Sequence, residues 1–385
     1  MRPAPVVRPA VPGAARSGYG RRMTLDPRAS AHRVRRARAA ALVGATALVV
    51  ATALVGAAGL AAPASAATPG TSGVVKVVGT GTPASCTPAA LAYAVKSGGT
   101  VRFDCGPKDV TIALDRTLFV CNTTTCRHPW QDPKAKVVQQ LVLDGGGKVT
   151  LSGQGARGIL YANTCEESFG WIDSRCDTQT TPYVLVKDIT FTRGDASRTP
   201  AGKASVGGGG GGGAIAMRGG RLTVQRATFR DNRCVQQHPD AGGGAIRVVG
   251  QKESARVLES TFTDNACANG GAVSSLQAPL LIRDSTFTGN TATGSGASSG
   301  QGGNGGAVYF DGTRQSVTIE RSTIQRNVAP EGGPGVFYVS NDRTGTLTIT
   351  DSTVTKNTGA RFWTYKFRSV FYLGKAFVRS GSTID

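Results

Sequence analysis

From residue 222 onward, apolar and polar positions follow one pattern that recurs five times. Each copy has an apolar–x–apolar run, a polar residue, a small residue, Thr, a bulky apolar residue and, three positions later, Asn. The bulky residues are Phe229, Phe262, Phe287, Ile324 and Val354, and the asparagines are Asn232, Asn265, Asn290, Asn327 and Asn357. The interval between copies varies while the pattern within a copy is kept, which is typical of a solenoid.

A second block, Gly-Gly-Ala followed by Ile or Val, belongs to each coil. It begins at Gly212, Gly243, Gly270 and Gly305, with a worn version at Gly333. The apolar positions alternate with period two, so each coil consists of short strands. The alternation slips by one at Arg226, which predicts a bend there. The matching positions of the other coils are polar: Glu259, Asp284, Arg321 and Asp351.

These coils predict an all-β fold, a single-stranded right-handed parallel β-helix with like residues stacked about 4.8 Å apart along the axis. The bulky column fills the core, and the Asn column forms hydrogen bonds at a turn. Gly-Gly supplies a corner that needs positive φ. We expect these asparagines and glycines to be structural. A weaker sixth copy contains Val184, Val186 and Phe191, with Gly194 in the Asn place.

Upstream of the repeats, Thr87, Pro88 and Gly98 frame a short helix over 89–97. Its apolar face predicts a cap on the first coil, made by Leu91, Ala94 and Val95. Strands are expected at 101–103, 110–114, 141–143, 149–151 and 159–161, and loops at 207–213 and 294–305. The aromatic and basic segment after Gly359 forms either a final coil plus cap, which we favour, or a binding lip.

The N-terminus predicts export. A basic run over 33–38 precedes an uncharged Ala/Leu/Val-rich stretch that closes with Ala64-Ser65-Ala66, an A-x-A cleavage signal. We therefore assign 1–66 to a signal peptide with an upstream extension, cleaved after Ala66, with Met23 as an alternative start. Residues 67–83 are assigned to a linker and 84–385 to one β-helix domain. No membrane span is expected after cleavage, so the protein is expected to be secreted.

Eight cysteines in an exported chain favour disulfides. Cys234 and Cys267 each lie two residues after a repeat Asn, so they stack one rung apart, within reach of a disulfide. The other expected pairs are local: Cys86–Cys105, Cys121–Cys126 and Cys165–Cys176. A zinc site at Cys121, Cys126 and His128 is the alternative for one pair, although it lacks a clear fourth ligand.

The charge of the chain changes on cleavage. The full chain carries +20, of which ten Arg and one Asp lie in 1–66, so residues 67–385 keep 34 basic and 23 acidic residues, a net charge of +11. A basic exported surface fits a polyanion such as a uronic-acid polysaccharide, a teichoic acid or anionic lipid, or else serves solubility alone. Nucleic acid is not expected, because no recognised motif is present. We expect a monomer.

The GGAI/GGAV, Ser-Thr-Phe and Asn elements resemble the polymorphic outer-membrane-protein type of β-helix repeat within the pectate-lyase-like superfamily. The helix, Gly98-Gly99-Thr100-Val101 and Thr111-Ile112-Ala113-Leu114 resemble the N-terminal cap of that superfamily, and the composition is similar to exported actinobacterial proteins. The resemblance covers nearly all of 84–358. It implies a fold that carries lyases, hydrolases, epimerases and non-catalytic adhesins alike.

Superfamily lyases hold Ca²⁺ with carboxylates and use Arg or Lys to remove the proton next to a uronate carboxylate, so Ca²⁺ is possible here although no cofactor is evident. No family active-site motif carries over, and geometry alone selects candidates. Residues two and four after each Gly-Gly-Ala alanine point outward on one sheet. Arg247 is the candidate base, with Asp311, Asp342 and Asp240 as acid or metal groups. Ordinary solvated charges are the alternative.

Two functions therefore remain open. One is a secreted lyase-like enzyme that acts on acidic polysaccharide, which predicts clustered acidic and basic groups on one face. The other is a non-catalytic rod that binds polymer or cell wall, which predicts a flat or aromatic face. Outward Tyr309, Phe337 and Leu276 fit sugar stacking under either function.

Overall fold

The computed structural model describes residues 74–120, 140–165, 176–197, 210–296 and 300–385. The chain divides into two units, residues 1–66 and residues 67–385, and all described residues belong to the second. The expected signal peptide lies outside the described residues. Within them, no helix is long and apolar enough to cross a membrane.

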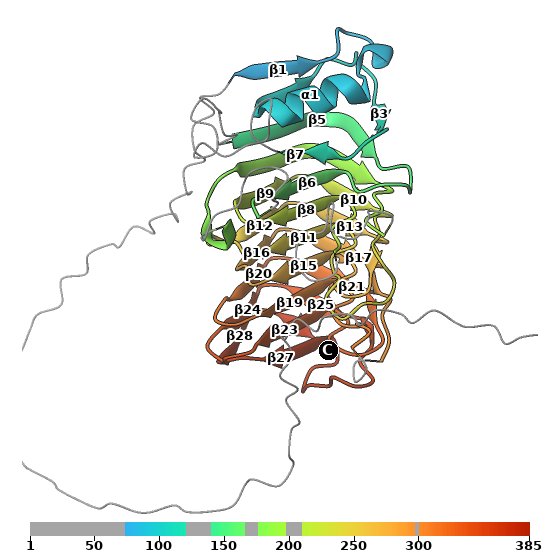
Figure 1. The fold of residues 1–385 in the computed structure, drawn as a ribbon. Coiled ribbons are helices and arrows are strands. Elements are labelled where there is room, and N and C mark those ends of the chain that lie inside the picture. The colour runs from blue at the N-terminus through green and yellow to red at the C-terminus, as the bar shows by residue number, and fades with distance from the viewer. Residues whose placement is uncertain (1–73, 121–139, 166–175, 198–209, 297–299) are drawn as a thin grey trace, which may run out of the picture. The chain divides into compact units, whose positions relative to one another are not determined.

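The described strands form three sheets, and every pairing between them is parallel (Figure 1). The eight-stranded sheet contains β4 (Leu118–Phe119), β6 (Leu160–Asn163), β8 (Ile215–Arg218), β11 (Ile246–Val249), β15 (Val273–Leu276), β19 (Val308–Gly312), β23 (Val336–Ser340) and β27 (Val370–Leu373). The four-stranded sheet contains β14 (Ala266–Cys267), β18 (Thr291–Ala292), β22 (Val328–Ala329) and β26 (Thr358–Gly359).

The third sheet has seventeen strands in two ladders, which β5 and β7 join because each runs through both. The first ladder contains β1 (Val75–Val78), β2 (Gly99–Phe103), β5 (Gln140–Ser152), β7 (Tyr183–Thr192), β9 (Arg221–Gln225), β12 (Ala255–Leu258), β16 (Leu280–Arg283), β20 (Val317–Glu320), β24 (Thr346–Thr350) and β28 (Ala376–Ser380). The second adds β3 (Val110–Ala113), β10 (Thr228–Arg230), β13 (Thr261–Thr263), β17 (Thr286–Thr288), β21 (Thr323–Gln325), β25 (Thr353–Thr355) and β29 (Thr383–Ile384).

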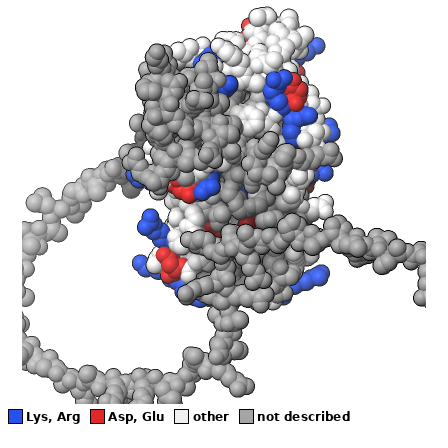
Figure 2. Space-filling view, viewed as in Figure 1, with Lys and Arg blue, Asp and Glu red and all other residues white. Residues whose placement is uncertain are grey.

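The chain bends between the two ladders at the position where the alternation of apolar residues shifts by one. Arg226 has a φ of 46°, and the four matching positions of the other coils have φ between 44° and 51°. The bend turns charged side chains outward, where they pair between coils: Arg226 Nε lies 2.7 Å from Asp188, and Arg321 Nε lies 2.8 Å from Asp284. The surface view in Figure 2 shows acidic and basic side chains side by side along the stack.

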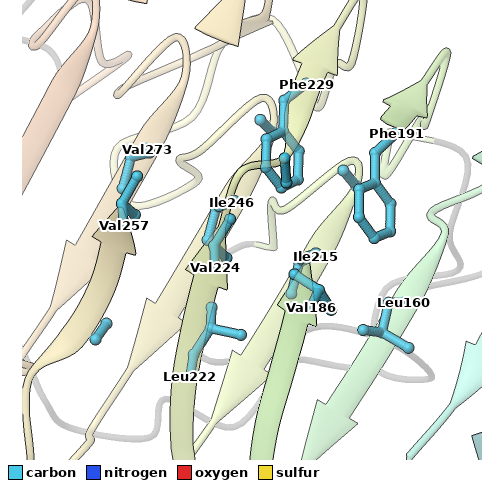
Figure 3. Packing of buried hydrophobic residues seen from close by; sticks show 14 of the residues in the cluster. Leu160, Val186, Phe191, Ile215, Leu222, Val224, Phe229, Ile246, Val257 and Val273 are labelled. Atoms are coloured by element: carbon cyan, nitrogen blue, oxygen red, sulfur yellow. The ribbon is translucent and has the colours of Figure 1, made fainter. Parts of the chain in front are cut away.

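Equivalent repeat positions pair directly, so the chain is a parallel β-helix, as the repeat predicts. Phe229 pairs with Phe191 on one side and Phe262 on the other. The rings stack inside the coil with centroids 5.0 Å and 4.7 Å apart, and Figure 3 shows Phe191 and Phe229 with the aliphatic side chains of the neighbouring strands. The core is therefore built of columns that run along the axis.

The Asn column is buried and fully hydrogen-bonded, as predicted. Asn265 Nδ2 donates to Asn290 Oδ1 at 2.9 Å and to the carbonyl of Phe229 at 3.0 Å, and its Oδ1 accepts from the backbone N and Nδ2 of Asn232. Gly194 ends the column, because its backbone N donates to Asn232 Oδ1 at 2.9 Å. The turn thus satisfies buried backbone groups that lie off the strand ladders.

The N-terminal helix forms as predicted. α1 (Pro88–Ser97) is capped by Thr87, which accepts from the backbone N of Ala90, and it ends at Gly98 with a φ of 68°. Leu91, Ala94 and Val95 are its buried residues and join the main core. In Figure 1, α1 lies at the end of the stack beside β1.

Two regions differ from the expectation, and a final coil is present. β1 lies inside the stretch assigned to a linker and pairs in register with β2, so the first coil begins earlier than 84. β5 is one continuous strand with a register shift between Asp144 and Val149, where two strands were expected. The final coil follows residue 369, as expected for this segment, and Ser382-Thr383-Ile384 repeat the Ser–Thr–bulky pattern.

The segment after Gly359 forms the expected cap and leaves two of its aromatic side chains exposed. Phe367 packs against the main core together with Tyr372 and Phe377 of the final coil, so it closes that end of the interior. Phe362 and Trp363 instead remain 52% and 36% exposed. The cap is therefore confirmed for Phe367, while Phe362 and Trp363 are left partly exposed.

Two predicted disulfides are present. Cys234–Cys267 joins successive coils with its Cα atoms 4.7 Å apart, and Cys86–Cys105 closes the region of the first coil. Cys165 is also disulfide-bonded. These bonds indicate an oxidising compartment outside the cytoplasm.

The other cysteine predictions lie outside the described part of the chain. This applies to the side chain of Cys176, the expected partner of Cys165. It applies equally to the Cys121–Cys126 pair and to the zinc alternative with His128.

Candidate functional site

The outer face of the eight-stranded sheet carries two columns of side chains in the predicted register. The first column is Ala216, Arg247, Ser274, Tyr309, Phe337 and Phe371. The second column is Arg218, Val249, Leu276, Asp311, Val339 and Leu373. Arg247 on β11 and Asp311 on β19 are therefore separated by one intervening strand, β15, as expected.

Loops cover the first column, which the repeat pattern did not predict. Asn269 Nδ2 donates to the carbonyls of Pro239 and Ala241 at 2.9 and 3.2 Å, which fixes the segment before the Gly-Gly corner. A Cβ on Gly242 would lie 3.0 Å from Nη1 of Arg247, so this backbone rests directly on the guanidinium. The predicted outward face is therefore largely closed over by the protein itself.

Arg247 lies on the outer face but is only 1% exposed. Its Nη1 donates to the hydroxyl of Ser274 at 3.2 Å. Burial lowers the pKa of Arg247 to about 10, against the opposing influence of Tyr309 and Asp240. A lowered pKa suits a base, but the covering backbone keeps the guanidinium from a bound polymer unless residues 239–242 move.

Asp311 lies at the edge of the covered region and is partly exposed. Its Oδ1 accepts from Asn341 Nδ2 at 2.7 Å, and its Oδ2 accepts from the hydroxyl of Tyr309 at 3.3 Å. Burial raises the pKa of Asp311, with a smaller contribution from Asp240, against the two hydrogen bonds. Asp311 is thus a carboxyl group that is partly shielded from solvent and hydrogen-bonded to polar neighbours.

The four candidate residues do not form one cluster. Asp240 influences the pKa of both Arg247 and Asp311, which places these three together. Asp342 instead belongs to the turn after β23, where its Oδ1 accepts from the backbone N and hydroxyl of Thr344 and from the hydroxyl of Ser340.

These carboxylates do not fit Ca²⁺. Asp342 and Asp311 already accept hydrogen bonds from neighbouring side chains, and Asp342 lies in a separate turn. In the ranges that the structure describes, no three His, Cys, Asp or Glu side chains gather so as to hold a metal ion.

An aromatic cleft of about 290 Å³ opens beside Asp311. Its main residues are Tyr309, Phe337, Phe371, Trp363, Asp311 and Asn341. Tyr309, Phe337 and Phe371 stack from coil to coil with centroids 5.4 and 4.9 Å apart, and Trp363 stands 5.4 Å from Phe371. Buried Asn304 Oδ1, which also borders this cleft, accepts no hydrogen bond from the described residues.

A polar cleft of about 490 Å³ lies on the same sheet face, nearer the N-terminus. Arg218 binds Asp177 there through two hydrogen bonds of 2.7 and 2.9 Å, and Gln277 and Gln315 also line the cleft. The second column lines both clefts: Arg218, Val249 and Leu276 in the polar cleft, and Asp311, Val339 and Leu373 in the aromatic cleft.

A third cleft, of about 480 Å³, lies beside the Asn column and is acidic. Asp195, Asp231 and Asp264 line it against a single cation, Arg233, whose Nε lies 3.8 Å from Asp195. Such a composition disfavours a polyanion.

Several of these contacts were not predicted from the sequence. Asn269 and Asn304 form a second, two-member Asn column, in which Asn269 Oδ1 accepts from the backbone N of Asn304 at 3.2 Å. Each directly precedes a Gly-Gly pair, which is a signal that the sequence does contain. Nothing in the repeat pattern pointed to the pairing of Arg218 with Asp177, since Asp177 lies outside the repeats.

No family model matches the chain, and neither a curated protein nor a solved structure matches it. The fold assignment rests on the strand pairing described above.

Proposed function

We propose that this is a secreted protein that binds an extended acidic polysaccharide along the outer face of the eight-stranded sheet. The observation that carries the proposal is the second column, because one row of side chains lines two successive clefts. A linear polymer laid along the axis would pass from the polar cleft to the aromatic cleft. Both clefts combine apolar surface with a few polar groups, as ligand sites commonly do.

The aromatic cleft supplies the chemistry for a sugar ring. Trp363, which is 36% exposed, presents apolar surface to the C–H face of a sugar, while Asp311 and Asn341 exchange hydrogen bonds with its hydroxyls. The net charge of +11 on residues 67–385 favours a polymer that carries carboxylates or phosphates.

Lyase chemistry is the second candidate, supported by Arg247. Its lowered pKa and its place two strands from Asp311 suit proton removal from a uronate, with Asp311 or Asp240 as the acid. Asp342, engaged in its own turn, would then act only in positioning. The covered guanidinium makes binding without chemistry the better-supported function.

Binding is tested with residues 67–385 and a panel of acidic polysaccharides, by pull-down and calorimetry. Trp363→Ala is expected to weaken binding about tenfold. Tyr93→Ala is the matched control, because Tyr93 is an aromatic residue 72% exposed on α1, away from both clefts. Equal affinity of the Trp363 variant and the wild type would contradict the proposed cleft.

Catalysis is tested on the same panel by the ultraviolet absorbance of unsaturated uronates. A rise in absorbance that Arg247→Ala abolishes would establish a lyase. A flat trace together with retention on the polymer would leave a binding protein and remove Arg247 from the site.

A further inference from the structure

The segment 361–368, Arg-Phe-Trp-Thr-Tyr-Lys-Phe-Arg, is exposed near the C-terminal end of the stack, between β26 and β27 (Figure 1). We call it the basic–aromatic loop. Three of its aromatic side chains are exposed: Phe362 at 52%, Tyr365 at 40% and Trp363 at 36%. Grouped exposure of large apolar side chains on one loop marks an interaction surface.

The exposure is not a result of a loose backbone. The backbone N of Arg361 donates to Pro330 O at 2.9 Å, and those of Phe362 and Trp363 donate to Glu331 O at 3.0 and 2.8 Å. The preceding coil therefore holds the loop in place and turns Phe362 outward.

The loop and the coil after it are basic, and two of their cations, Lys366 and Arg379, lie over the ring of Phe367. Residues 361–379 contain five cations and no Asp or Glu: Arg361, Lys366, Arg368, Lys375 and Arg379. Among the described residues, none of these five takes part in an ion pair. Arg226 and Arg321, on the side of the stack, are each held by a carboxylate of a neighbouring coil.

The arrangement of the rings distinguishes this loop from the aromatic cleft. Phe362 and Trp363 meet edge to face, with an interplanar angle of 83° and centroids 5.1 Å apart. Phe362, unlike Trp363, does not line the aromatic cleft. Aromatic side chains that protrude beside cations suit the boundary between lipid headgroups and acyl chains.

We propose that the basic–aromatic loop docks the protein on an anionic lipid surface. Phe362 enters the headgroup layer, and Arg361, Lys366 and Arg368 lie against lipid phosphates. Since Trp363 also borders the aromatic cleft, docking places that end of the polymer site next to the membrane.

The test measures flotation of residues 67–385 with vesicles of equal parts phosphatidylglycerol and phosphatidylcholine, against vesicles of phosphatidylcholine alone. The triple variant Arg361→Gln/Lys366→Gln/Arg368→Gln is expected to reduce partitioning to the anionic vesicles about a hundredfold, roughly fivefold for each cation. Phe362→Ser is expected to reduce it severalfold, with binding of the wild type falling as salt is raised. Trp363 stays in every variant, so the aromatic cleft is unchanged.

The matched control is Arg230→Gln/Arg256→Gln/Arg326→Gln, three exposed cations on the strand face and turns of other coils. It removes the same charge and is expected to leave vesicle binding within twofold of the wild type. Equal losses in the two triple variants would reduce the effect to net charge and overturn the proposal. So would an absence of binding to anionic vesicles at low salt, or a loss of polysaccharide retention in the loop variant without any vesicle binding.

Discussion

At the scale of single residues, the Asn column shows why one side chain is repeated. At each turn, one side chain must accept from a backbone N–H, donate to a backbone carbonyl and bind the Asn of the next coil. An amide side chain can do this because it carries both a donor and an acceptor. Asn290 does all three: its Oδ1 accepts from the backbone N of Asn265, and its Nδ2 donates to the carbonyl of Phe262 and to Asn327. A carboxylate would repel its neighbours, and a glutamine would not fit the same turn.

Asp311 gives a prediction on pH dependence. Burial raises its pKa above the ordinary value of 3.8, so the folded state binds more protons than the unfolded state, and the ionised group costs stability as the pH rises above 3.8. Asp311→Asn does not titrate. The free energy of unfolding of this variant, relative to that of the wild type, is therefore expected to increase between about pH 3 and pH 7, as measured by chemical unfolding.

Asp342→Asn is the control, with the opposite sign. Hydrogen bonds, first from the backbone N of Thr344, lower the pKa of Asp342, so its contribution is present above 3.8 and is lost as the pH falls. This variant is expected to lose stability relative to the wild type as the pH rises. Parallel pH curves for the two variants would argue against the environment assigned to Asp311.

At the scale of the element, the two glycines of the Gly-Gly corner are needed for different reasons. Gly243 has a φ of 74°, which an L side chain rarely adopts. Gly244 has no such φ, but a Cβ there would lie 2.3 Å from the carbonyl oxygen of Gly271 and 2.6 Å from the backbone N of Ala266. The backbones of neighbouring coils therefore approach each other closely at this corner.

Gly244→Ala is therefore expected to cost about 3–5 kcal/mol in the free energy of unfolding, because backbone atoms on two sides cannot move aside. Gly146→Ala is the control, since Gly146 has a φ of 59° but nothing within 4 Å of its Cβ position. It is expected to cost only about 1 kcal/mol, the strain of the left-handed conformation. Comparable losses in the two variants, measured by chemical unfolding, would show that close approach is not the constraint.

The elements that the sequence predicted are those set by local pattern. The register of the columns, α1 with its Thr87 cap and the Cys234–Cys267 pair all follow from spacing within or between repeats. The cover over Arg247 did not, because it depends on the path of a variable loop that Asn269 fixes from another coil. The aromatic cleft was missed for the same reason, since Asn341 and Trp363 reach it from different coils.

At the scale of the whole described unit, the stacking of coils turns one outward position per coil into a line of side chains along the axis. Equivalent outward positions on β8, β11, β15, β19, β23 and β27 form the second column, which spans five inter-strand steps, or roughly 24 Å. The ends of this line differ: Arg218 with Asp177 occupies one, and the Trp363 side of the aromatic cleft occupies the other. A polymer with a direction would therefore meet different chemistry at its two ends.

The length of this line predicts how affinity depends on the length of the ligand. One step along the axis is comparable to one sugar unit, so affinity for acidic oligosaccharides is expected to rise with length up to about five units and then level off. Arg218→Ala is expected to weaken binding of the longer oligosaccharides several-fold and to leave the shortest ones, seated in the aromatic cleft, unaffected. Calorimetry across a size series measures both effects. An affinity that does not depend on length would confine the ligand to one cleft, because only a chain that spans both clefts can contact Arg218 and Trp363 together.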